Sequence, residues 1–127
     1  LYSYLKSAEE SGILLQTSVT IPDILPVDPA GLAICFANAL GNAIECCEKL
    51  PKEKRKIIFK CIGKPRMMFE IENPQPDRIT FGRNGLPRLP EGGMEAHIRS
   101  IVAFCEKYDA FYSFTAESGW FKVIVTL

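Results

Sequence analysis

The stretch Asn38-Ala39-Leu40-Gly41-Asn42-Ala43-Ile44-Glu45 is the most informative part of this 127-residue chain. Residues three or four positions apart lie on one face of an α-helix, so Asn38, Asn42 and Glu45 would share a face. Asparagine is a mediocre helix former, so its repetition within a helix needs a reason. Carboxamide oxygens are hard, neutral ligands that can hold Mg²⁺ while the ion keeps waters and bridges to phosphate oxygens. The alternative is that both asparagines face solvent or cap the helix.

The residues around this stretch predict a helix over about 29–49. Asp28 can accept hydrogen bonds from the first free amides, and Pro29 suits the first turn. Pro51 follows the last turn and ends the pattern. Apolar side chains recur at intervals of three and four, at Leu32, Phe36, Ala39, Leu40, Ala43, Cys46 and Cys47. One face of the helix is therefore predicted to pack on a core.

The rest of the chain alternates between helical and strand-like patterns. Helices are predicted over residues 2–11 and about 95–107, and strands over 13–21, 57–62, 66–71, 111–116 and 120–127. The strand at 13–21 alternates as a half-buried strand does, and the basic segment 52–56 is interpreted as a solvated loop. Residues 73–93 are rich in proline and glycine, which indicates a functional loop or lid, with room for a short strand at 78–81. Helices followed by hairpin-paired strands predict an α+β layer fold.

Composition limits the class of protein. A chain of this length corresponds to one domain, and 15 basic residues balance 15 acidic ones, which disfavours nucleic-acid binding through a basic surface. No apolar run approaches the roughly 18–20 residues that span a bilayer. Five cysteines without Cys-x-x-Cys spacing, and His97 as the single histidine, favour buried reduced thiols in the cytosol over a zinc site or disulfides. The chain begins at Leu1 without a methionine, so we expect it to be part of a longer protein.

The segment at 38–45 resembles the N-box of the GHKL ATPase superfamily. In the catalytic domain of sensor histidine kinases related to quorum-sensing peptide receptors, this box is close to Asn-Leu-Leu-Asp-Asn-Ala-Ile-Glu-Ala. The resemblance extends over nearly the whole chain, through YLKSAEESGI near the start, FEIENP at 69–74 and the final helix and hairpin at 98–127. It implies an α/β two-layer sandwich of the Bergerat type over residues 1–127, with a mixed, mostly antiparallel sheet and about three helices on one face.

The resemblance also implies a function. Such a domain binds ATP and Mg²⁺, and transfers the γ-phosphoryl group to a histidine on a separate upstream segment. The hydrolysing branch of the superfamily has a glutamate at the position of Asn38, and an asparagine cannot usefully accept the proton from water, so the match favours phosphotransfer. The implied partners are the dimerisation and phosphoacceptor helices of the same protein and a response regulator, with no nucleic acid or membrane contact by this domain. The implied location is the cytoplasmic side of a membrane-bound bacterial sensor.

By the same resemblance, individual residues acquire expected roles. Asn42 would be the Mg²⁺ ligand, Asn38 would lie beside the triphosphate, and Glu45 would be a polar wall residue. Asn73 occupies the place of an aspartate that accepts from the adenine amino group, and its carbonyl oxygen can still accept from an amine. The alternative for Asn73 is an Asn-Pro turn initiator. The pocket is expected between the helix that carries Asn38 and Asn42 and the lid at 73–95.

The second glycine box departs from the family pattern. Where the family has Gly-His-Gly-Ile-Gly, this chain has Gly93-Met94-Glu95-Ala96-His97. Glu95 at a helix N-terminus would satisfy the helix dipole itself and oppose a triphosphate. Gly92 and Gly93 could contact phosphate instead if the lid is shifted by two or three residues. The rival hypothesis is therefore a degenerate, nucleotide-free domain that acts as an interaction module, and His97 is not expected to be the phosphorylated residue.

Overall fold

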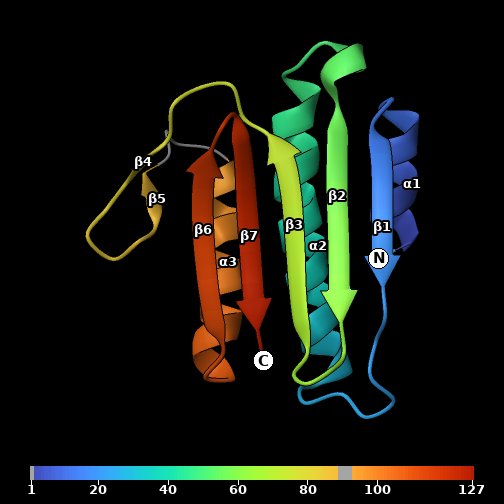
Figure 1. Ribbon diagram of the computed structural model, residues 1–127, viewed down its shortest axis with the longest axis vertical. Helices are drawn as coiled ribbons and strands as arrows, with labels where there is room; N and C mark the ends of the chain where they lie inside the picture. The colour runs from blue at the N-terminus through green and yellow to red at the C-terminus, as the bar shows by residue number, and fades with distance from the viewer. Residues whose placement is uncertain (1, 89–92) are drawn as a thin grey trace.

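The computed structural model describes residues 2–88 and 93–127 of the chain. Its helices are α1 (Tyr2–Glu10), α2 (Pro29–Glu48) and α3 (Gly93–Lys107), with a short 3₁₀ helix η1 at Lys52–Lys54. Its strands are β1 (Leu14–Val19), β2 (Lys56–Ile62), β3 (Met68–Pro74), β4 (Thr80–Phe81), β5 (Pro87–Arg88), β6 (Phe111–Glu117) and β7 (Trp120–Thr126). Figure 1 shows α2 and α3 lying along the long axis of the sheet.

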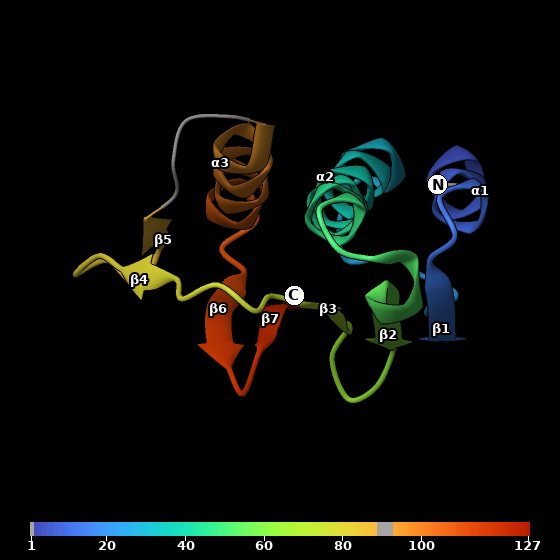
Figure 2. The same cartoon turned by 90° about the horizontal axis from the view of Figure 1, so that it is seen from above.

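The strands form a five-stranded sheet in the order β1-β2-β3-β7-β6. Only β1 and β2 are parallel, and the other three pairs are antiparallel. The three helices lie on one side of this sheet (Figure 2), while β4 and β5 form a separate two-stranded hairpin. The predicted two-layer sandwich with a mixed, mostly antiparallel sheet is therefore confirmed.

Helix α2 forms where the cap and the apolar spacing predict it. The Asp28 side chain accepts from the Gly31 amide at 3.2 Å, and Pro29 is the first helical residue. An 18-residue window of this helix has a mean hydropathy of 1.4, so α2 is long and apolar enough to cross a membrane, which the sequence alone did not predict. Of that window, 61% is buried within the fold, because the helix packs on the sheet as a core element.

The first strand differs from the prediction. We expected residues 13–21 to form a half-buried strand, but β1 lies at the edge of the sheet and most of it is exposed. Leu14 has an exposed fraction of 60%, whereas Ile13, just before the strand, is buried. Alternation within the segment therefore identified the strand correctly but could not reveal its edge position, which depends on which strand pairs with it.

The basic segment after α2 is also more ordered than predicted. Arg55 donates from Nη1 to the Ser11 carbonyl at 2.7 Å, from Nε to the Leu50 carbonyl at 2.9 Å and from Nη2 to the Glu48 carbonyl at 3.1 Å. The interpretation of 52–56 as a solvated loop was therefore wrong for Arg55. Its guanidinium satisfies carbonyls at the end of α2 and after α1.

On the sheet face away from the helices, Lys122 of β7 lies between two carboxylates of β3. Its Nζ lies 2.9 Å from Glu70 Oε1 and 2.9 Å from Glu72 Oε1. Burial raises the pKa of Glu70, but the ammonium hydrogen-bonded to it brings that pKa below its usual value. The same bonds raise the pKa of Lys122. The lysine thus screens two like charges that lie side by side on one strand.

We expect Lys122→Met to lower the free energy of unfolding by about 1 kcal/mol at neutral pH. A carboxyl whose pKa is lower in the folded state stabilises the fold above its unfolded pKa, and this contribution is lost as the pH falls through the folded value. The loss caused by Lys122→Met should therefore shrink at about pH 3.5. Urea denaturation at neutral pH and at about pH 3.5 measures this loss of unfolding free energy, with Lys6→Met at an exposed position of α1 as the control. An equal loss at both pH values would contradict the screening role.

Candidate functional site

One face of α2 carries the residues that the sequence singled out. Asn38 is half-buried, and its Nδ2 donates to the Ile34 carbonyl at 3.0 Å, which leaves its Oδ1 turned the other way. Asn42, one turn later, has an exposed fraction of 1%. Glu45 lies at the exposed end of the same face. The predicted shared face is therefore present, and Asn38 and Glu45 on it face α3.

The side chain of Asn42 has an unusual environment. Its Oδ1 is buried and accepts no hydrogen bond from the described residues. A buried carbonyl oxygen without a donor costs about 1–3 kcal/mol, so such an atom in a folded protein needs an explanation. A neutral amide oxygen of this kind is a suitable ligand for a hard cation such as Mg²⁺. Asn42 therefore fits the ion that the resemblance implies.

Asn73 lies inside a strand and not at a turn. It is the second-last residue of β3, pairs with Phe121 of β7 and is fully buried, while its Nδ2 donates to the Pro74 carbonyl at 3.0 Å. Burial raises the pKa of the Cys46 thiol to about 11, against the opposing effects of nearby Lys49 and of a hydrogen bond with Asn73. This hydrogen bond brings Asn73 to the α2 helix, next to the face that carries Asn42. The turn-initiator interpretation of Asn73 was therefore wrong.

The N-terminal part of α3 brings His97 onto the same face of α2. The His97 Nδ1 lies 3.0 Å from Asn38 Oδ1, and its Nε2 lies 3.2 Å from Glu45 Oε1. His97 lies within α3, as the predicted helix over about 95–107 implies, and its ring faces α2, which the sequence did not predict. The signal that could have revealed this contact is Gly41, a helix-interior glycine between Asn38 and Glu45 that leaves room for a ring.

The glycine box is only partly described. Gly93 is the first residue of α3, and Glu95 is exposed in the first turn, as the sequence predicts for a residue that meets the helix dipole. Gly92 lies outside the described residues. The structure thus brings Asn38, Glu45 and His97 into direct contact and brings Asn73 to α2 through Cys46.

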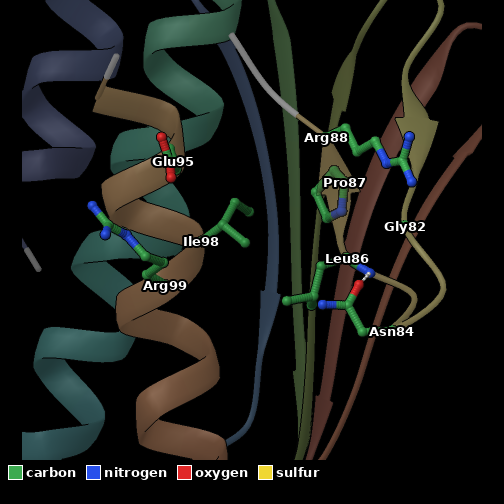
Figure 3. Close-up of a pocket in the computed structure, with 8 residues that line it drawn as sticks. All are labelled: Gly82, Asn84, Leu86, Pro87, Arg88, Glu95, Ile98 and Arg99. Atoms are coloured by element: carbon green, nitrogen blue, oxygen red, sulfur yellow. Dashed lines mark hydrogen bonds between the residues drawn. The ribbon is translucent and has the colours of Figure 1, made fainter. Parts of the chain in front are cut away.

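A cavity of about 290 Å³ lies between the β4–β5 hairpin and α3. Figure 3 shows Ile98 of α3 pointing toward the hairpin, while the guanidinium groups of Arg88 and Arg99 point away from the space between them. The Asn84 side chain accepts from the Leu86 amide at 3.0 Å and closes the hairpin turn. The cavity is lined by Gly82, Asn84, Leu86, Pro87, Arg88, Glu95, Ile98 and Arg99. None of the predicted site residues of α2 or β3 is among them, so this cavity is distinct from the expected pocket.

Comparison with known proteins shows the family of the chain and its fold. The family model described as the GHKL domain matches residues 27–127, so the chain belongs to the GHKL family. Its fold is that of a histidine kinase catalytic domain, as the similar solved structures show. No curated protein matches the chain.

Three solved structures illustrate the likeness. The catalytic domain of the histidine kinase ThkA has a TM-score of 0.73 at 13% identity, with 99% of this chain and 86% of ThkA covered. The histidine kinase AdeS of Acinetobacter baumannii has a TM-score of 0.67 at 13% identity, with 99% and 61% covered. Full-length ShkA, in complex with AMPPNP, has a TM-score of 0.66 at 15% identity, with 98% and 28% covered. The chain thus spans about three-fifths of AdeS, and identities this low show the fold alone.

Proposed function

We propose that this domain binds ATP with Mg²⁺ as the catalytic domain of a sensor histidine kinase. The observation that carries the proposal is the buried Oδ1 of Asn42, which lacks a donor among the described residues and lies one turn from Asn38. The GHKL family match and the AMPPNP bound by ShkA, a protein of the same fold, support nucleotide as the ligand.

Within this proposal, each site residue has a chemical task. Asn42 would hold Mg²⁺, which supplies charge neutralisation for the phosphates when bound. Asn38 would position the triphosphate, and Glu45 would form a polar wall. Asn73 would accept from the adenine amino group through its carbonyl oxygen. Gly92 and Gly93 would offer backbone amides to phosphate where a side chain would obstruct it.

The phosphoryl transfer itself would need a second segment. The acceptor would be a histidine on helices upstream of this domain, and the phosphoryl group would pass on to a response regulator. Catalysis of such a transfer rests on positioning and charge neutralisation, and Asn38 offers no carboxylate that would activate water. The whole protein would be a bacterial membrane-bound sensor with this domain in the cytoplasm.

A second function has support from the α2–α3 contacts. His97 already contacts Asn38 and Glu45, and Glu95 places a carboxylate in the first turn of α3. A carboxylate there takes the favourable position near the helix dipole that a phosphate would otherwise use. These contacts favour a nucleotide-free module that signals through protein contacts.

Titration with AMPPNP, with and without Mg²⁺, distinguishes the two functions. The catalytic-domain proposal predicts Mg²⁺-dependent heat of binding and a rise in melting temperature, since a ligand at 100 times its dissociation constant adds about 2.7 kcal/mol of stability. Adenosine with Mg²⁺ is the control, because it lacks the phosphates that a metal would bridge. The absence of a shift at millimolar AMPPNP would favour the interaction module.

A further inference from the structure

We propose that His97 is an internal latch, which bonds Asn38 and Glu45 on the α2 face and must give up both bonds before a ligand can take its place there. The inference rests on the proposed function for the identity of the ligand, but the latch itself is a contact between two helices. It makes His97 a determinant of ligand access.

The orientation of Asn38 determines how His97 binds to it. Since Asn38 Nδ2 donates to the Ile34 carbonyl, its Oδ1 is the atom directed at the ring, and Nδ1 of His97 must carry a proton to donate to it. The other ring nitrogen, Nε2, faces a carboxylate oxygen of Glu45 at 3.2 Å, which is attractive only when Nε2 also carries a proton. The imidazolium form therefore makes both bonds, and both are to residues of the candidate site.

Gly41 provides the space that the ring fills. A Cβ built on Gly41 would lie 2.9 Å from His97 Cε1 and 3.2 Å from His97 Nε2, closer than van der Waals contact allows. Glycine is otherwise a poor choice for a helix interior. The ring thus packs directly on the α2 backbone, and any side chain at position 41 would displace it.

Charged side chains near His97 lie on two different sides of α3. Glu45 is the titratable side chain that α2 presents to His97. Its charged neighbours on α3, Glu95 and Arg99, line the cavity on the side of the β4–β5 hairpin. A ligand that enters between α2 and α3 must displace the ring from Glu45, so ligand entry and the position of the ring are coupled.

Opening the latch should increase ligand affinity. We expect His97→Ala to bind AMPPNP with Mg²⁺ about tenfold more tightly than the natural chain, because the bonds from His97 to Asn38 and Glu45 no longer have to be broken. Gly41→Ala should give a similar gain by displacing the ring, and it keeps the imidazole. Arg99→Ala on the same helix is the control and should leave the affinity unchanged. Unaltered affinity in both His97→Ala and Gly41→Ala would overturn the proposal.

The latch can also be tested without any nucleotide. Because His97 is the only histidine, the imidazole signals in an NMR spectrum belong to one residue. We expect these signals to move in Gly41→Ala and in Glu45→Gln, and the melting temperatures of His97→Ala, Glu45→Ala and the double variant to be non-additive. Failure of AMPPNP to bind every variant would refute the proposed function while leaving this test valid. Additive melting temperatures with unmoved ring signals would refute the latch.

Discussion

Asn42→Leu is expected to abolish Mg²⁺-dependent nucleotide binding while leaving the stability of the domain unchanged or higher. Leucine has nearly the shape of asparagine, and it replaces a buried oxygen that accepts no hydrogen bond from the described residues. Removing such a polar atom from a buried site is neutral or stabilising, in contrast to the usual cost of a core substitution. A residue whose loss removes binding and does not weaken the fold is present for the ligand.

The binding loss should be at least about 100-fold, since a metal ligand and its charge neutralisation disappear together. Calorimetric titration with AMPPNP and urea denaturation of the ligand-free protein measure the two effects. Asn42→Asp is the matched variant: it keeps an oxygen ligand but buries a charge, so it should be less stable in EDTA and recover when Mg²⁺ is added. Unchanged affinity in Asn42→Leu would remove Asn42 from the site. A loss of several kcal/mol would show that its side chain is structural.

Local signals in the sequence were sufficient for the main elements of the fold. The cap by Asp28, the first-turn proline and the three-and-four spacing of apolar residues define α2 to within one residue of its observed end. The strands of the β6–β7 hairpin were predicted equally well, and Gly119 in the turn between them takes the positive φ that glycine readily adopts. These features depend on neighbours along the chain, which a sequence displays directly.

Features that depend on distant partners were predicted less well. The edge position of β1 follows from its parallel pairing with β2, about 40 residues later along the chain by register. Composition alone predicts a solvated Arg55, because the carbonyls it binds, among them that of Ser11 far along the chain, cannot be recognised from composition. In both cases the environment depends on a tertiary partner that the local sequence does not identify.

In the candidate site, too, the sequence predicted what depends on local spacing and missed what depends on distant partners. The shared face of Asn38, Asn42 and Glu45 follows from helical spacing, but the contact of His97 with two of them requires knowing that α2 and α3 lie side by side. The sequence marked Glu95 and His97 together as departures from the glycine box. The structure separates them: Glu95 lines the cavity beside the hairpin, whereas His97 faces α2. Glu95 and His97 therefore lie on different sides of α3.

Phe36→Ala is expected to lower the free energy of unfolding by about 3–5 kcal/mol, a large part of the stability of a domain of this size. The Phe36 ring is buried on the inner face of α2, edge-on to Phe69 with centroids 4.8 Å apart and to Phe59 with centroids 5.4 Å apart. It therefore joins α2 to β2 and β3 at once, and alanine would leave a cavity where both strands meet the helix.

The same substitution tests how the site depends on the core. Asn38 and Asn42 lie within two turns of Phe36 on the same helix, so loosening α2 from the sheet should move both amides and weaken ligand binding. Urea denaturation gives the stability, and hydrogen exchange of α2 amides reports where the loosening occurs. Phe36→Leu should cost less than about 1.5 kcal/mol, and Ile34→Ala on the exposed side of α2 should cost less than about 0.5 kcal/mol. A Phe36→Ala protein as stable as Ile34→Ala would mean that α2 is held on the sheet by other contacts, and the position of the site would then not depend on this aromatic cluster.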